Sequence, residues 1–390
     1  MITRQRLVTF GIPTVATATI VTAALLTTDG DREITPGCCV HNDLAGPFTT
    51  IPSHRVAGSH PIDVVFAVDT TGSMGGLLDG AKRTVWSIAS HIRDTDPNAD
   101  LRIGLVAYRD TGDDYITKPF SLTSDLDSVY GELASYTASG GGDFPEHVDA
   151  ALDDSLHKMQ WRADAKRLIF VVGDAPPHAE PRGGVPSHNA LAREAADSGI
   201  VINTIRCGTN PEALAAFERI AQLGHGAFST IEQDGGVQEI ATPYDNEIAT
   251  LSARIDRTTI IIGGETARQH YDATITANEA APAAAKADRA AYYGKGSTGG
   301  MVRGTDDLVG GYATGDVDLG SVQDADLPTE LRGKDKAEIK AEVERRVAER
   351  KELQAKITEL SKQRTEYLSK QTKSDGFDAK VNATIEAQLK

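Results

Sequence analysis

Two hydrophobic periods alternate along the middle of the chain. Residues 62–68 and 168–172 are nearly continuous apolar runs, as in strands of a parallel sheet that is buried on both faces. Between residues 75 and 92, apolar side chains recur at helical spacing instead. Strands that alternate with helices over about 200 residues indicate an α/β fold with a doubly wound, mainly parallel sheet.

The same pattern predicts the other elements of this unit, which we expect to span residues 61–256. Further strands are expected at 101–108, 201–206 and 226–230, with an edge strand at 115–122. Helices are expected at 125–136, 145–158, 187–198, 211–223 and 237–255. Ligands of such folds bind at the carboxyl ends of the parallel strands, so the loops that follow these strands are the place to look for chemistry.

The first residues have the pattern of an export signal. Arg4 and Arg6 precede an uncharged run over residues 7–28, which is typical of a signal peptide. Because the run is also long enough for a marginal membrane span, residues 1–28 are expected to be a cleaved signal peptide or an N-terminal membrane anchor. The protein is then periplasmic, membrane-anchored or secreted, and residues 29–60 form a linker.

The charge of the chain excludes one class of function. With 40 basic and 56 acidic residues, the formal net charge is −16, so nucleic acid should be repelled. The chain has only three cysteines, which is too few for a disulfide scaffold. Either Cys38 or Cys39 pairs with Cys207 in an exported protein, or Cys207 is a buried residue at a strand end.

The loop after the first strand offers oxygen ligands at alternate positions. Asp69, Thr71 and Ser73 supply a carboxylate and two hydroxyls, and Gly72 permits a tight turn between them. Hard cations such as Mg²⁺ take oxygen ligands and keep several waters. The same residue types are also common in turns and as helix N-caps.

Two further loops carry acidic residues. Residues 139–146 contain three consecutive glycines, followed by Asp143 and Glu146. No Lys-Ser/Thr ending is present, so this loop is not a phosphate-binding loop. Asp174 follows the apolar run 168–172 and is expected to point into the crevice at the strand ends.

These three loops together resemble a von Willebrand factor type A domain of a bacterial, exported type. The resemblance implies a metal-ion-dependent adhesion site (MIDAS) that holds Mg²⁺, or another divalent cation such as Mn²⁺ or Ca²⁺. Asp69, Thr71, Ser73 and Asp174 match the metal-binding positions of that family. The family also implies a protein partner that presents an acidic residue to the metal.

One position departs from the family pattern. The second loop usually provides a metal-coordinating Thr, but this stretch offers Gly142 and Asp143. Asp143 is therefore a candidate ligand, or else an N-cap of the following helix. As a ligand, it would neutralise the cation further and weaken its attraction for a partner's carboxylate.

Three other polar residues lie close to these loops in the sequence. His178 is expected at the rim of the site or as a hydrogen-bonding loop residue. Asp110 is expected behind the ligands or in a turn. Glu146 is expected to stabilise the first turn of its helix through the helix dipole.

The C-terminal part has a different composition. Residues 257–333 are expected to contain a strand at 258–262, a helix at 278–291 and loops at 294–315, with no chemical motif. Residues 334–373 are charge-dense and carry an imperfect heptad pattern, in which Arg346, Arg350 and Arg364 interrupt the apolar seam. This segment is expected to be a helix or coiled coil. It packs on the acidic main domain, pairs with a second tail, contacts another partner or forms a solvated helical hairpin arm, and residues 374–390 form a tail.

Three functions are compatible with these features. The first is a non-catalytic, metal-dependent protein-binding module at the cell envelope. The second is a hydrolase that uses the bound metal, with His178 as the only nearby base. The third is a structural assembly protein that acts through its coiled coil.

Overall fold

The computed structural model describes five stretches of the chain: residues 59–142, 144–236, 240–295, 306–371 and 376–389. The predicted signal peptide or anchor and nearly all of the predicted linker lie outside the described residues, as do Cys38, Cys39 and Asp143. Cys207, at the end of the fifth strand, is a buried free thiol.

Six strands form one sheet in the order β3-β2-β1-β4-β5-β6. All neighbours are parallel except β3, which is the antiparallel edge strand. The strands are β1 (His60–Asp69), β2 (Ala99–Tyr108), β3 (Thr117–Thr123), β4 (Lys166–Gly173), β5 (Ile200–Cys207) and β6 (His225–Ile231). The doubly wound, mainly parallel sheet predicted from the sequence is confirmed.

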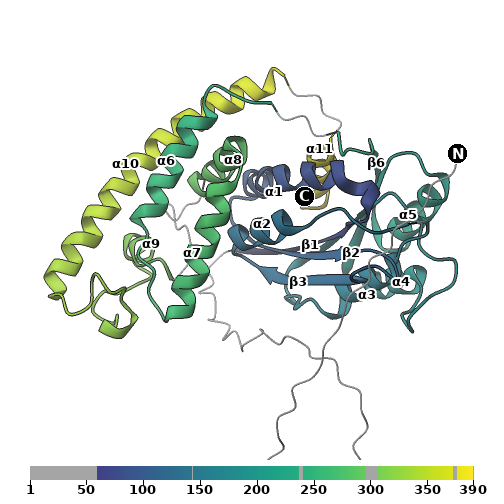
Figure 1. The fold of residues 1–390 in the computed structure, drawn as a ribbon, viewed down its shortest axis with the longest axis horizontal. Coiled ribbons are helices and arrows are strands. Elements are labelled where there is room, and N and C mark those ends of the chain that lie inside the picture. Colours follow the sequence, from purple (N-terminus) through teal and green to yellow (C-terminus); the bar gives the residue numbers. More distant parts are fainter. Residues whose placement is uncertain (1–58, 143, 237–239, 296–305, 372–375, 390) are drawn as a thin grey trace, which may run out of the picture. The chain divides into compact units, whose positions relative to one another are not determined.

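Helices cover both faces of the sheet (Figure 1). Successive residues of β1 point to opposite faces, so Val64 and Phe66 belong to one core and Val65 and Ala67 to the other. The first core is covered by α1 (Gly75–Thr95) and α2 (Leu126–Ser135). The second is covered by α3 (Val148–His157), α4 (His188–Asp197) and α5 (Pro211–Leu223).

The region after β6 differs from the prediction. It contains α6 (Asp245–Thr258), α7 (Glu265–Ala280), α8 (Ala283–Gly294) and α9 (Leu308–Thr314). The strand predicted at 258–262 is wrong, because Thr258 ends α6 and only Ile261 pairs, in a single bridge. The helix predicted at 278–291 is two helices, because Pro282 cannot continue α7. The loop prediction for 294–315 missed α9.

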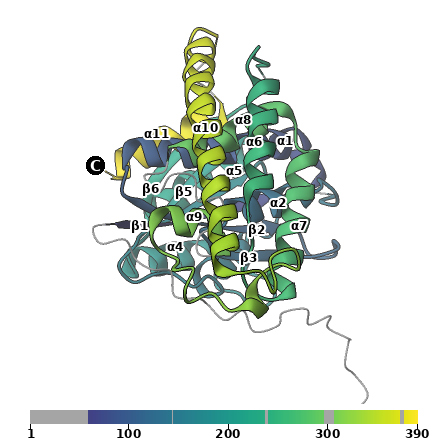
Figure 2. The ribbon, with the colours of Figure 1, turned by 90° about the vertical axis from the view of Figure 1, so that its left-hand side faces the viewer.

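A long helix, α10 (Lys336–Ser369), covers the segment with the heptad pattern. Its apolar residues pack within the chain: Leu353 and Ile357 join a cluster with α6 and α8, and Val343 joins a cluster with α9. Figures 1 and 2 both show α10 beside α6. We call the described residues between 245 and 371 the helical region.

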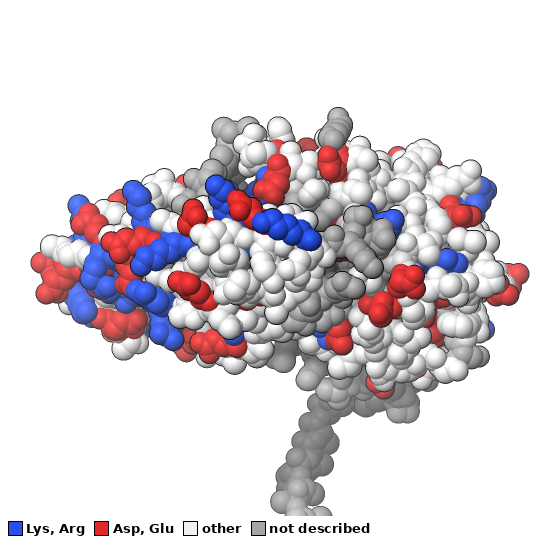
Figure 3. Space-filling model, turned by 90° about the horizontal axis from the view of Figure 1, so that it is seen from above, with Lys and Arg blue, Asp and Glu red and all other residues white. Residues whose placement is uncertain are grey.

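The arginines that interrupt the heptad seam find carboxylates in this arrangement. Arg350 is 3% exposed and pairs with Asp307, which is fully buried. Arg364 bonds to Asp245 of α6 and to Asp288 of α8. Acidic and basic side chains also alternate over the surface at the left-hand end of the space-filling view (Figure 3). Pairing with carboxylates allows these cations to lie in an otherwise apolar interface.

A buried network joins the helical region to the α/β unit. Arg289 of α8 donates hydrogen bonds to both carboxylate oxygens of Asp127 on α2, at 2.6 and 3.0 Å. The same guanidinium bonds to Asp256 of α6, and Asn278 of α7 donates to Asp127. One arginine therefore ties three helices of the two parts together.

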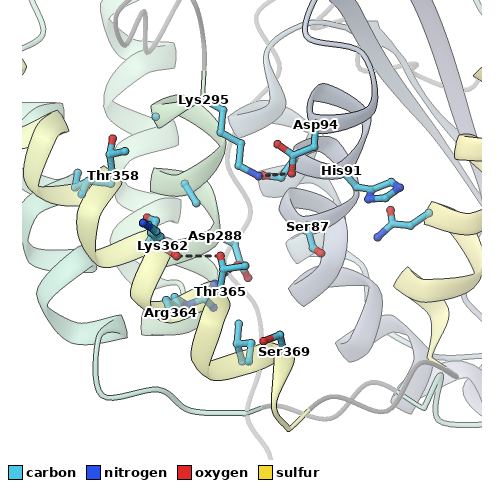
Figure 4. A pocket seen from close by; sticks show the side chains of 17 residues that line it. Ser87, His91, Asp94, Asp288, Lys295, Thr358, Lys362, Arg364, Thr365 and Ser369 are labelled. Carbon is cyan, nitrogen blue, oxygen red and sulfur yellow. Dashed lines mark hydrogen bonds and ion pairs between the residues drawn. The ribbon is translucent and has the colours of Figure 1, made fainter.

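A cavity of about 500 Å³ lies beside this contact, between α1, α8, α10 and the last helix (Figure 4). Hydroxyl groups line much of it, including those of Ser87, Thr358 and Thr365. Lys295, which follows α8, and Asp94 of α1 form an ion pair of 2.6 Å at its edge. The ion pairs around the cavity, such as that of Arg364 with Asp288, connect neighbouring helices.

The last helix, α11 (Phe377–Leu389), completes the cover of the sheet. Phe377, Val381 and Ile385 are buried in the same core as Phe66, and the rings of Phe66 and Phe377 lie 6.3 Å apart. The chain thus leaves the α/β unit after β6, builds the helical region and returns. The predicted division at residue 256 stays a prediction, and these contacts argue that residues 61–256 lack part of their own core.

None of the helices formed by the described residues is both long and apolar enough to cross a membrane.

The contribution of α11 can be measured with one substitution. Phe377→Ala should lower the free energy of unfolding by about 3–5 kcal/mol, because it removes a buried ring from the core. Phe144, which is 54% exposed, provides the control, and Phe144→Ala should change stability by less than about 0.5 kcal/mol. Denaturant unfolding of both variants tests this. Equal stability of the two would show that α11 adds little to the core.

The buried pair of α10 gives a second test. Asp307→Leu should cost about 3–5 kcal/mol, because Arg350 then loses its buried counter-charge. The double variant Asp307→Leu with Arg350→Met should recover most of this loss, since no buried charge remains. Chemical denaturation of the single and double variants measures the difference. A double variant as unstable as the single one would contradict the explanation.

Candidate functional site

The first loop folds around the carboxyl group of Asp69, the last residue of β1. Its Oδ1 accepts hydrogen bonds from the backbone N–H of Thr71 at 2.8 Å and from the Thr71 hydroxyl at 2.6 Å. The hydroxyl oxygens of Thr71 and Ser73 lie 3.3 Å apart. Asp69 is fully buried and Thr71 is 1% exposed, whereas Ser73 is exposed. The three predicted ligands therefore lie together, with Ser73 at the mouth.

Asp174 reaches the same place from β4, the strand beside β1. A Cβ on Gly173 would lie only 3.3 Å from Asp69 Oδ2 and 2.3 Å from the Tyr108 hydroxyl, so the adjacent strand ends need a glycine there. Asp174 Oδ2 accepts a 2.6 Å hydrogen bond from Gln233, which also bonds to the Ser73 carbonyl. Gln233 follows β6 and was not expected at the site, since its role depends on a contact between distant loops.

Arg109 forms hydrogen bonds with the first loop and with the segment that leads into the second. It is 3% exposed, and its guanidinium donates to the carbonyls of Thr70 at 3.1 Å and Thr137 at 2.8 Å. The guanidinium also lies 4.4 Å from the ring centre of Tyr115. The guanidinium therefore bonds mainly to backbone carbonyls, and its contact with the exposed Asp114 is longer, at 3.4 Å. The sequence offered no signal for this role.

The glycine-rich second loop lies against the first. Gly72 N–H bonds to the Gly140 carbonyl, and Gly141 N–H bonds to the carboxylate of Asp113. Gly141 has a φ of 66°, and a Cβ there would collide with Thr71 and with Glu146 Oε1 at 2.6 and 2.7 Å. Glycine thus allows Glu146 to approach the first loop.

Glu146 does not have the position that its sequence context predicts. Helix α3 begins at Val148, with His147 as its N-cap, so Glu146 lies before the helix and not in its first turn. Its N–H bonds to the Pro176 carbonyl at 3.0 Å, which holds it between the second and third loops. Glu146 is buried there, with 1% of its surface exposed.

His178 and Asp110 form a pair beside the site. His178 Nε2 lies 2.6 Å from Asp110 Oδ1, and His178 is only 4% exposed. The ring of His147 packs edge-on against that of His178. His178 is therefore a buried hydrogen-bonding residue and not an exposed residue at the rim.

Three carboxyl oxygens in this crevice are buried and have no hydrogen-bond partner among the described residues: Asp69 Oδ2, Asp174 Oδ1 and Glu146 Oε2. Burial raises the pKa of Asp69 to about 7; hydrogen bonds from Thr71 oppose this rise, and the charge of Asp174 adds to it. Burial and the neighbouring carboxylates raise the pKa of Glu146 to about 9. Without a cation, the crevice therefore disfavours ionised carboxyls.

The donor set fits a hard divalent cation. Asp69 and Asp174 each offer an unpartnered oxygen, and the hydroxyls of Thr71 and Ser73 lie beside the first. Within the part of the chain that the structure describes, no three His, Cys, Asp or Glu side chains are placed to hold one ion together. A site here would thus use two carboxylates with two hydroxyls, and Glu146 would stand outside the ligands.

Comparisons with known proteins place the α/β unit in one family. Residues 63–222 match the family model of the von Willebrand factor A domain. The chain is 37% identical to von Willebrand factor A domain-containing protein 7 of Rattus norvegicus over 112 residues, which is 29% of this chain and 12% of the relative. It is 25% identical to the alpha-protein kinase vwkA of Dictyostelium discoideum over 126 residues, or 32% and 20% of the two chains. The chain spans at most about a fifth of these curated relatives.

Solved structures show weaker likeness. BatB from Bacteroides thetaiotaomicron aligns with 18% identity and a TM-score of 0.35, over 44% of this chain and 90% of that one. Proximal thread matrix protein 1 from the mussel byssus, described with a zinc-occupied MIDAS motif, aligns with 18% identity and a TM-score of 0.34, over 44% and 41%. Likeness at this level says nothing about the function of this chain.

The buried carboxyls predict how stability depends on pH when no cation is present. In the unfolded chain, Asp69 and Glu146 ionise near their ordinary pKa values of 3.8 and 4.5, but in the fold they ionise at about 7 and about 9. As pH rises between these values, the unfolded chain loses protons that the folded protein keeps, so stability falls.

Thermal unfolding in chelator should therefore show a lower melting temperature at about pH 8 than at about pH 5. Asp69→Asn should flatten this dependence, because one of the two groups no longer titrates. Asp79→Asn removes a carboxylate that is exposed on α1 and should keep the wild-type slope. A wild-type slope in Asp69→Asn would contradict the assignment.

Proposed function

Because residues 63–222 form a von Willebrand factor A domain, we propose that this chain is a non-catalytic protein-binding module that works through a divalent cation. Asp69, Thr71, Ser73 and Asp174 would hold the ion, with Mg²⁺ as the first candidate. The observation that carries this proposal is a pair of buried carboxylates at adjacent strand ends, each with one oxygen that has no partner among the described residues, beside two hydroxyls.

The exposure of the site supports binding of a large partner. Asp69 and Thr71 are buried at the floor, whereas Ser73 is exposed at the mouth. Carboxylates at the floor would hold the ion on one side and leave its other side toward solvent. The bound cation would supply an open coordination position that an oxygen atom of a partner can fill.

Asp143 remains a candidate ligand only by proposal, since it lies outside the described residues. Export remains a proposal as well, based on Arg4, Arg6 and the uncharged run that follows them. A domain exported in this way would meet its protein partner at the cell envelope.

The hydrolase alternative is less well supported. A metal-dependent hydrolase needs a base that can reach the reacting water. His178 is 4% exposed, and its Nε2 is engaged with Asp110. This geometry favours a structural role for the histidine, so we retain the binding function.

The metal assignment can be tested by calorimetry. The purified protein should bind one Mg²⁺ in a saturable titration, and Asp69→Asn should abolish the signal because it removes a ligand charge without removing volume. Asp79→Asn is the matched control for the loss of one negative charge and should bind as the wild type does. Unchanged Mg²⁺ binding in Asp69→Asn would refute the proposed ligand set.

The same variants test the link between the metal and the partner. Immobilised wild-type protein should retain a partner from an envelope extract in Mg²⁺ and release it in chelator. Asp69→Asn should retain none, and Asp79→Asn should behave as the wild type. Retention that survives both chelator and Asp69→Asn would instead favour assembly through the helical region.

A further inference from the structure

The second loop, which lacks the family's threonine, is approached at Gly141 by the carboxyl group of Glu146. Glu146 Oε1 and the side chain of Thr71 both lie within 2.7 Å of the place where a Gly141 Cβ would stand. Only a glycine leaves room for both groups, so the carboxyl of Glu146 lies directly against the first loop. Its second oxygen, Oε2, is buried and has no partner in the described parts of the chain.

The backbone fixes Glu146 in this position. Its N–H bonds to the Pro176 carbonyl, and it pairs with Pro177 in an isolated parallel bridge. The next residue, His147, donates its N–H to the Arg109 carbonyl at 3.2 Å. The backbone of Glu146 is thus joined to the loop that carries Asp174, which places the start of its side chain at the site.

The surroundings of Glu146 are acidic. The charges that act on it come from Asp69, Asp110, Asp113 and Asp174. The nearby guanidinium of Arg109 is directed to the carbonyls of Thr70 and Thr137. Among the described residues, no positively charged side chain forms a hydrogen bond with Glu146. Other buried carboxylates in this part of the chain commonly have such a partner.

We propose, on the basis of the metal site proposed above, that Glu146 makes the loaded site select a neutral oxygen ligand from its partner, such as a carboxamide, hydroxyl or backbone carbonyl, over a carboxylate. Asp69 and Asp174 already balance the charge of a divalent cation. A cation in the crevice would favour the ionised form of Glu146, which lies beside it. This third carboxylate leaves the loaded crevice negative, and an incoming carboxylate is repelled more strongly there than in water. Neutral oxygens are ordinary ligands of hard cations and meet no such repulsion.

This role differs from that of a ligand. No three carboxyl groups among the described residues are placed to hold one ion, so Glu146 acts on the site through its charge. Removing that charge should weaken metal binding modestly and strengthen the binding of a carboxylate to the metal-loaded protein. A residue with a purely structural role cannot produce these opposite effects.

The test uses Mn²⁺ as a paramagnetic ion, with fluoroacetate and fluoroacetamide as probes of equal size and different charge. The ¹⁹F relaxation rate of each probe reports its binding to protein-bound Mn²⁺. At saturating Mn²⁺, Glu146→Gln should raise the enhancement for fluoroacetate relative to fluoroacetamide at least about threefold over the wild type. Glu180→Gln, which removes an exposed carboxylate in the third loop, should leave the ratio unchanged.

The outcomes separate the two proposals. If the wild type binds no Mn²⁺, the metal site itself is wrong. If Mn²⁺ binds and Glu146→Gln keeps the wild-type ratio, the site stands and the role of Glu146 is overturned. Circular dichroism confirms that the variants are folded, and Glu146→Ala, which also removes the charge, should shift the ratio in the same direction if Glu146→Gln does not fold.

Discussion

Burial of several carboxyl groups in one crevice, to which their mutual repulsion adds, is the constraint on which the site depends. Asp69 and Asp174 end adjacent strands, and Glu146 is held against the same loops by its own backbone bonds. Each has a buried oxygen without a hydrogen-bond partner in the described residues. Because the backbone holds these three residues close together, protonation or a bound cation would relieve the cost of burying several charges in one place. The raised pKa values of Asp69 and Glu146 show the first of these in the metal-free protein.

In and around the helical region, buried carboxylates are instead paired with arginines. Asp127 is paired with Arg289, Asp245 with Arg364, and Asp307 with Arg350. Each pair joins helices that are distant in the sequence, and each satisfies both charges. The chain therefore has arginines for the carboxylates that hold its helices together. Arg109 is equally buried and lies beside the crevice, yet it bonds to backbone carbonyls. This difference distinguishes the carboxylates of the proposed binding site from those of the scaffold.

Much of the α/β unit could be predicted from the sequence because its signals are local. The apolar runs of β1 and β4 and the helical periodicity of α1 can be recognised from neighbouring residues alone. The same local signals placed Asp69, Thr71, Ser73 and Asp174 at strand ends. Long-range contacts gave no such signal. Gln233 and Arg109 act through loops that are distant in the sequence, and Glu146 was assigned to a helix that begins two residues later. The heptad pattern of α10 predicted a helix, but the partners of its seam depend on tertiary packing.

The path of the chain connects the site to the end of the molecule. Gln233 bonds to Asp174 and to the Ser73 carbonyl, and two residues later the Gly235 carbonyl accepts the N–H of Phe377. One short loop thus contacts both the proposed ligands and the first turn of α11. Because α11 also fills the core beside Phe66, the order of this loop depends on a helix that follows the whole helical region in the sequence. The helical region is therefore better regarded as an insertion before the last helix of the α/β unit than as a tail added behind a finished domain.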